Sequence, residues 1–190
     1  MQVDTLSKGK HAPAVQEHFS KFTDNMGGII WDKDPETGQE IGVCKGMFAT
    51  DKERVPFTNE FECRGPVEEW LLELMANCIN NFRDQLETSA NEYVEMPRDK
   101  WLEKYCAQLC ITTCQIWWTT DVYQAFERLE QGNDQAMKEY STNQIANLNI
   151  YIQLVLGEMT KEMRTKVKTL ITIEVHALSL IHISEPTRPY

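Results

Sequence analysis

Three regularly spaced cysteines are the first candidates for chemistry in this sequence. Cys106, Cys110 and Cys114 follow one another at four-residue steps, so a helix would place them along one face. Clustered thiolates can bind zinc or carry out redox chemistry. Three ligands along a helix, however, climb about 12 Å at about 1.5 Å per residue, which is too far for one tetrahedral ion. The spacing therefore favours packing of these small apolar side chains in a core over a metal or thiol site.

Residues of other catalytic types do not fall into the patterns that catalysis requires. His11, His18 and His176 are scattered along the chain, and none belongs to an H-E-x-x-H sequence. The sequence contains neither a G-x-S-x-G nucleophile motif nor a G-x-x-x-x-G-K-[ST] phosphate-binding loop. The acidic pair Glu68-Glu69 lies at the start of a predicted helix, where negative charge faces exposed amides and solvent. We therefore expect no catalytic, cofactor-binding or metal-binding residue in this chain.

The composition indicates a folded protein and argues against two kinds of partner. Of the 190 residues, 42% are hydrophobic and five are tryptophan, which provides enough apolar surface for a core. A formal charge of −10 opposes binding to nucleic acid, which depends on clustered Lys and Arg. No apolar stretch approaches the roughly 20 residues that span a bilayer, and the N-terminus lacks a signal-peptide pattern. We expect a cytoplasmic protein with free thiols that binds neither nucleic acid nor membrane.

Apolar spacing and turn signals divide the chain into three regions. Residues 1–26 predict a short helix, and residues 27–61 predict a small β-hairpin or meander, because short β-prone runs alternate there with turn signals. Residues 66–177 predict a bundle of long helices, in which apolar residues recur at three- and four-residue steps. The predicted fold is mainly α: an elongated helical bundle with a small β insertion. Helix starts or breaks are predicted at Pro66, Met96-Pro97, Gly132-Asn133 and the N-cap residue Thr160.

The last residues resemble a laboratory sequence. The eleven residues from Leu178 to Arg188 match one reading frame of a common transposon-based sequencing adapter. We therefore expect residues 178–190 to be non-biological and leave them out of the fold and function predictions.

Two further features could serve recognition. Trp117 and Trp118 are adjacent, and on a helix their side chains point about 100° apart, so that one can enter the local core while the other packs on a second element. The basic stripe Lys161, Arg164 and Lys168 lies on a predicted helix in an acidic chain and could dock on a carboxylate-rich surface. A solvated helix face is the simpler explanation of the stripe.

Four stretches resemble, in order, motifs of dynein heavy chains. GPVEEWL from Gly65 to Leu71 is similar to a G-x-VE-x-WL run, and MPRDKWL from Met96 to Leu102 is similar to a K-PR-x-x-W segment. QIWWTTDV from Gln115 to Val122 resembles QIWWT-x-EV, and TLITIEVHA from Thr169 to Ala177 resembles T-x-x-TI-DVHARD. In the last motif, Glu174 stands where the family usually has Asp. The signature positions are Trp70, Pro97, Trp101, Gln115, Trp117, Trp118, Thr119 and His176.

The resemblance implies a place and a role for residues 1–177. They look like part of the linker that immediately precedes the first AAA+ module, and the QIWWTT stretch looks axonemal rather than cytoplasmic. In that family the linker is a lever of a minus-end-directed microtubule motor in cilia and flagella. The implied partners are the AAA+ ring of the same heavy chain, other dynein subunits and microtubules. ATP and Mg²⁺ would belong to the ring of the parent protein, and the segment itself would be non-catalytic.

Two other functions remain open at this stage. A free-standing helical adaptor could hold a partner through the basic stripe or the tryptophans. A thiol or metal enzyme built on the cysteine triplet would contain bound metal or a thiol of low pKa.

Overall fold

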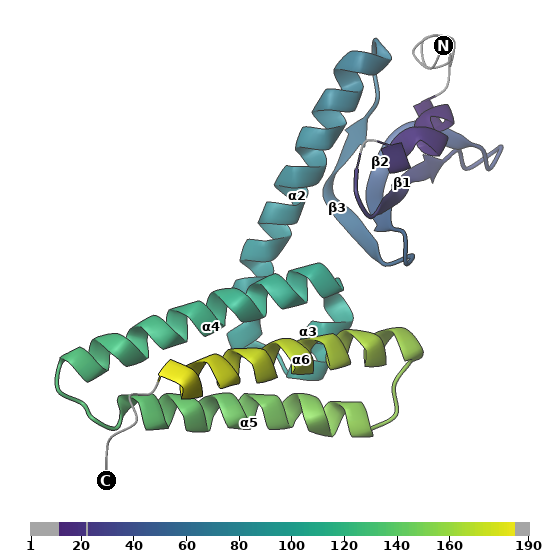
Figure 1. Cartoon of the computed structure of the whole chain (residues 1–190). Helices are drawn as coiled ribbons and strands as arrows, with labels where there is room; N and C mark the ends of the chain where they lie inside the picture. The colour runs from purple at the N-terminus through teal and green to yellow at the C-terminus, as the bar shows by residue number, and fades with distance from the viewer. Residues whose placement is uncertain (1–11, 22, 185–190) are drawn as a thin grey trace. The chain divides into compact units, whose positions relative to one another are not determined.

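The computed structural model describes residues 12–21 and 23–184, and these confirm a mainly α fold with a small antiparallel sheet (Figure 1). The chain divides into two compact units, which meet in the sequence between Gln85 and Leu86. Along the described residues, no helix combines the length and the apolar character needed to cross a membrane.

A three-stranded antiparallel meander forms the centre of the first unit. Its strands are β1 (Met26–Lys33), β2 (Glu40–Ala49) and β3 (Arg54–Glu62), in the spatial order β1-β2-β3. Lys45 on the central strand forms ion pairs with Asp32 on β1 and Glu60 on β3, at 3.1 and 3.4 Å. The predicted meander over residues 27–61 is therefore confirmed.

The helix predicted for residues 1–26 is shorter than expected. Within the described residues, a 3-10 helix, η1 (Ala12–Lys21), occupies this region, while residues 1–11 and 22 lie outside them. Met26, the last residue of the region predicted to contain the helix, begins β1 instead. Asn25 adopts a left-handed backbone with φ of 64°, a conformation that ends helical geometry and that Asn tolerates. The side-chain oxygen of Gln16 then accepts hydrogen bonds from the β1 backbone N–H of Ile29 and the indole N–H of Trp31, both at 3.1 Å.

The core of the first unit lies between η1, the sheet and the first half of helix α2 (Val67–Glu95). Pro66 precedes this helix as predicted, and its carbonyl accepts the backbone N–H of Trp70 at 3.2 Å. Trp70 is 3% exposed and belongs to this core. The fully or nearly buried members are Val15, Phe19, Ile29, Trp31, Cys44, Trp70, Leu74 and Cys78.

The second unit contains the end of α2 and the helices α3 (Arg98–Lys104), α4 (Ala107–Glu130), α5 (Ala136–Leu156) and α6 (Lys161–Ser184). The helical region that the sequence predicted after Pro97 is interrupted, since Tyr105 is extended at the end of α3 and Cys106 is the N-cap residue of α4. Helices α4, α5 and α6 pack side by side and run in alternating directions through short connections (Figure 1). Thr160 is the N-cap of α6, as predicted: its hydroxyl accepts a hydrogen bond from the backbone N–H of Met163 at 3.2 Å.

Candidate functional site

The tandem tryptophans on α4 point to different neighbours, as the helical geometry predicts. The indole N–H of Trp117 donates to the backbone carbonyl of Ala90 on α2 at 2.9 Å, and its ring stacks on Tyr93 with a centroid distance of 6.1 Å. Trp118 instead packs against Ala125 and Tyr140, in a cluster formed by α4 and α5. The pair therefore ties α4 to two different helices of the second unit.

The second anchor of the α2 end is Trp101 on α3. Its side chain is completely buried, and its indole N–H donates to the carbonyl and the hydroxyl of Ser89 at 3.1 and 3.2 Å. Its ring meets that of Tyr93 edge to face at 5.1 Å, and the guanidinium of Arg98 lies 3.5 Å from the Tyr93 ring centroid. We call Tyr93, Arg98, Trp101 and Trp117 the aromatic clamp.

Pro97 positions the clamp. It separates α2 from α3, and its carbonyl accepts the backbone N–H of Trp101 at 3.0 Å. Because proline lacks a backbone N–H and restricts the residue before it, α2 ends at Glu95 and the chain turns into α3. The turn places Trp101 against the final turns of α2, next to Ser89.

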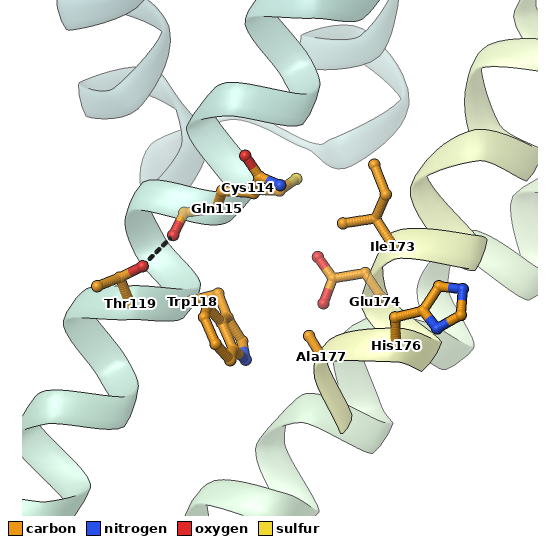
Figure 2. A pocket seen from close by; sticks show the side chains of 8 residues that line it. All are labelled: Cys114, Gln115, Trp118, Thr119, Ile173, Glu174, His176 and Ala177. Atoms are coloured by element: carbon orange, nitrogen blue, oxygen red, sulfur yellow. Dashed lines mark hydrogen bonds between the residues drawn. The ribbon is translucent and has the colours of Figure 1, made fainter. Parts of the chain in front are cut away.

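A pocket of about 420 Å³ opens between α4 and α6, and it is the candidate site of the second unit (Figure 2). One wall comes from α4 and the other from residues 173–177 of α6. Gln115 and Thr119 are exposed at the first wall, and the hydroxyl of Thr119 donates to the carbonyl of Gln115 at 2.8 Å. The lining residues are Cys114, Gln115, Trp118, Thr119, Ile173, Glu174, His176 and Ala177.

A buried carboxyl group lies on the α6 wall of this pocket. Glu174 is 7% exposed, and its side chain points into the space between the two helices (Figure 2). Burial raises the pKa of Glu174, while the positive charge of Arg98 acts in the opposite direction. The site therefore favours a neutral carboxyl group more than solvent would.

The opposite wall carries an indole and a thiol. The indole N–H of Trp118 is buried and lacks a hydrogen-bond partner among the described residues. The sulfur of Cys114 lies 3.3 Å from the hydroxyl of Tyr151, and burial raises the pKa of this thiol to about 11. A thiol with this pKa is protonated at neutral pH and is a poor nucleophile. The pocket therefore offers hydrogen-bonding groups and an apolar wall rather than a nucleophile with its base.

The predicted packing of the cysteine triplet is confirmed. Cys106, Cys110 and Cys114 are 8%, 0% and 2% exposed, and all three are reduced thiols. Cys106 is the N-cap residue that precedes α4, so the expected row along one helix face consists of Cys110 and Cys114, which lie on the buried side of the helix. Across the described residues, no group of three His, Cys, Asp or Glu side chains is arranged to hold a metal ion.

The basic stripe divides into exposed and engaged residues. Lys161 and Lys168 are exposed, as predicted. Arg164, which the sequence assigned to the outward face, instead donates to the carbonyl of Val155 and, at 3.1 Å, to that of Gly157. These carbonyls lie at the end of α5, where cations stabilise unpaired acceptors. A docking role for the stripe stays a prediction that rests on the two lysines.

The structure gathers four signature residues at the pocket and three at the clamp, and it places Trp70 in the other unit. Sequence reasoning missed Glu174 and Arg98 as interacting groups, although both lie within the quoted motifs. A charged residue that interrupts the apolar face of an otherwise amphipathic helix was the available signal for Glu174. Gln115, Trp118, Thr119 and His176 line the pocket, and Pro97, Trp101 and Trp117 form or position the clamp.

Comparison with known proteins identifies relatives of this chain. The family described as "Dynein heavy chain, N-terminal region 2" matches residues 3–89. The ciliary dynein beta chain of Heliocidaris crassispina is 40% identical over 179 residues, which cover 94% of this chain. The chain belongs to the dynein heavy chain family. The alignment with the ciliary beta chain covers 94% of this chain, whereas the family match covers residues 3–89.

Other dynein heavy chains give the same picture. Dynein axonemal heavy chain 11 of Sus scrofa is 38% identical over 94% of this chain, and the flagellar outer arm dynein beta chain of Chlamydomonas reinhardtii is 31% identical over the same share. The chain spans 4% of the length of each of these relatives. It thus corresponds to a small part of a dynein heavy chain.

Proposed function

We propose that this chain is a segment of the mechanical linker of an axonemal dynein heavy chain, in a minus-end-directed microtubule motor of cilia or flagella. The names of its relatives, which describe ciliary, axonemal and flagellar outer arm chains, support the axonemal location. The segment itself is non-catalytic in this proposal. ATP and Mg²⁺ bind elsewhere, in the AAA+ ring of the parent heavy chain.

The aromatic clamp is the observation that carries the mechanical role. A lever must transmit force without absorbing it, and close-packed protein interiors resist compression. Helix α2 has 29 residues and is therefore about 44 Å long at about 1.5 Å per residue. Trp101 and Trp117 hold its final turns through three indole hydrogen bonds and two aromatic contacts to Tyr93. The final turns of α2, which are fixed in this way, can transmit force within the second unit.

Polar contacts brace the same turn of α2. Glu92 accepts a hydrogen bond from the hydroxyl of Tyr105 at 2.7 Å and forms an ion pair with Lys104 at 2.6 Å. The ammonium of Lys166 on α6 donates to the carbonyls of Leu102 and Tyr105, at 3.2 and 2.7 Å. These bonds connect α2, α3 and α6, so a displacement of one helix strains the others.

The proposal assigns partners through the parent protein. The segment acts on the AAA+ ring of its own heavy chain, and the whole motor engages other dynein subunits and microtubules. In this proposal the pocket between α4 and α6 is a space between two packed helices of the lever. These two helices stay packed together while the lever moves.

A motility assay tests the mechanical role. Full-length heavy chain with this segment would carry Trp117→Ala, with Glu130→Gln, an exposed position on α4, as the matched control. We expect the Trp117 variant to lower microtubule gliding velocity more than it lowers ATP hydrolysis, because force is lost between ring and load. The control should change neither quantity.

The same assay separates the motor from the adaptor function. If the segment were a free-standing adaptor, weakening its clamp would leave gliding velocity unchanged even when the unit is measurably destabilised. That result would reject the lever.

A further inference from the structure

Two cysteines of the first unit lie thiol to thiol across neighbouring segments. Cys44 is on β2, Cys63 directly follows the end of β3, and their sulfur atoms are 3.6 Å apart. Both are free thiols.

The backbone fixes this arrangement. Cys44 is paired with Phe61 in the antiparallel ladder, and the backbone N–H of Cys63 donates to the carbonyl of Gly42 at 2.8 Å. Side chains two residues apart on a strand share a face, so Cys63 lies on the same face as Phe61 and diagonally opposite Cys44. The two thiols therefore meet because of the strand register.

The two thiols differ in their access to solvent. Cys44 is completely buried in the core of the unit, whereas Cys63 is partly exposed at its edge. The hydrogen bond from the Cys44 thiol lowers the pKa of Cys63, and the same bond together with burial raises the pKa of Cys44. Cys63 is thus the thiol that a small oxidant reaches and that loses its proton first.

We propose that Cys44 and Cys63 form a redox pair, in which a peroxide oxidises Cys63 and Cys44 then closes an intramolecular disulfide. In the first step the Cys63 thiolate attacks one peroxide oxygen, the O–O bond breaks, and hydroxide leaves and takes up a proton to form water. The sulfur of Cys63 is oxidised to a sulfenic acid while the peroxide is reduced.

In the second step the sulfur of Cys44 attacks the sulfur of Cys63. The S–O bond breaks, and the hydroxide that leaves combines with the Cys44 proton as a second water. Two thiols and one hydrogen peroxide thus give one disulfide and two waters. To form the bond, the sulfur atoms must approach from 3.6 Å to about 2.05 Å.

The disulfide would fix the connection into α2. Cys63 stands four residues before Val67, the first residue of that helix, and Cys44 lies on the central strand of the sheet. The bond would close a loop between residues 19 apart in sequence. Such a cross-link restricts the unfolded chain, so the oxidised first unit should melt at a higher temperature than the reduced one.

Cys78 is an alternative disulfide partner in the first unit. It belongs to the same core and is 6% exposed, and burial raises the pKa of its thiol to about 11. Its thiol is therefore both shielded and protonated. The geometry assigns the bond to Cys44 and Cys63 and leaves Cys78 reduced.

Peptide mapping of the whole chain tests the pair without any substitution. Reduced protein would be treated with one equivalent of hydrogen peroxide, blocked with N-ethylmaleimide, digested and analysed by mass spectrometry. We expect a linked peptide that contains Cys44 and Cys63, with loss of two hydrogens, which dithiothreitol reverses. A link between Cys44 and Cys78, a link between two chains, or no link at all would overturn the proposal.

Variants test the order of the steps. In Cys44→Ser, the sulfenic acid of Cys63 should persist and react with dimedone, whereas in Cys63→Ser the Cys44 thiol should stay unmodified. Cys78→Ser is the matched control and should still form the disulfide. Oxidation of Cys44 in the Cys63→Ser variant, with circular dichroism unchanged from the wild type, would reject the assigned roles.

Discussion

The indole N–H of Trp117 donates a 2.9 Å hydrogen bond to the backbone carbonyl of Ala90, 27 residues earlier in the chain. Ala90 lies within α2, so this bond joins α4 to the interior of another helix. The Trp117 ring also stacks on Tyr93, one helical turn further along α2. One side chain thus contributes both a polar and an apolar contact to the same helix.

Replacing Trp117 separates these two contributions. Trp117→Phe keeps a ring against Tyr93 but loses the N–H, and we expect it to lower the free energy of unfolding by about 1 kcal/mol. Trp117→Ala also removes the ring and should cost about 3–5 kcal/mol. Urea unfolding followed by circular dichroism measures both values. Equal losses in the two variants would mean that the ring contributes nothing beyond its hydrogen bond.

A second prediction concerns two buried hydroxyl groups. The hydroxyls of Ser89 on α2 and Thr113 on α4 lie 3.0 Å apart, and both residues are completely buried. Ser89→Ala or Thr113→Val alone leaves one hydroxyl without this partner and should cost about 1–3 kcal/mol. The double variant removes both groups and should cost clearly less than the sum. A double-mutant cycle of unfolding free energies measures the coupling, and strict additivity would show that the hydroxyls do not interact.

Local signals in the sequence were sufficient for much of the fold. Helix α2 carries its own start signal at Pro66 and its own stop signal at Pro97, and its apolar residues repeat at helical spacing. The N-cap at Thr160 is also a local signal, since the hydroxyl acts on a residue three positions away. These features depend on near neighbours, which is why they could be predicted.

Features that depend on partners far along the chain could not be predicted in the same way. β3 is mostly exposed and contains Pro56, so it lacks the alternating pattern of a strand and depends on pairing with β2. The role of Arg164 depends on where α5 ends. The pocket brings Trp118 and Glu174 together from helices that meet only through tertiary packing. Neither apolar spacing nor a motif contains this information.

The close approach of β2 and β3 gives a prediction for the first unit. A Cβ atom at Gly46 would lie 2.7 Å from the carbonyl oxygen of Val55 and 3.0 Å from the Cα of Pro56. Both atoms belong to the backbone and cannot move aside, so Gly46→Ala should separate the strands and cost about 1–3 kcal/mol.

Gly42 provides the matched control on the same strand. A Cβ atom there would lie 3.5 Å from its nearest neighbour, the side chain of Ala12, which is an ordinary contact. We expect Gly42→Ala to leave the melting temperature of the first unit nearly unchanged, whereas Gly46→Ala lowers it. Equal melting temperatures for the two variants would contradict the strand spacing described above.

The pocket carboxyl gives a prediction about pH. Burial raises the pKa of Glu174 in the folded state, although the charge of Arg98 opposes the shift, and the carboxylate of Asp121 adds to it. An unfolded glutamate has a pKa of about 4.3, and the pKa of Glu174 is raised in the folded state, so the folded state holds this proton more tightly than the unfolded state does. The second unit therefore loses stability as the pH rises from about 4.3 through the raised pKa of Glu174, and the loss is complete above that value.

Glu174→Gln removes the charge while keeping the shape of the side chain. We expect the variant to melt at a higher temperature than the wild type at pH 7, and this advantage should disappear at pH 4, where the wild-type carboxyl is neutral in the folded state. Glu162→Gln, at an exposed position on the same helix, controls for the general loss of one negative charge. Calorimetric melting of the three proteins at both pH values measures the effect. If the advantage of the Glu174→Gln variant were equal at pH 4 and pH 7, buried charge would not be its cause, because only the ionised carboxylate carries a desolvation penalty.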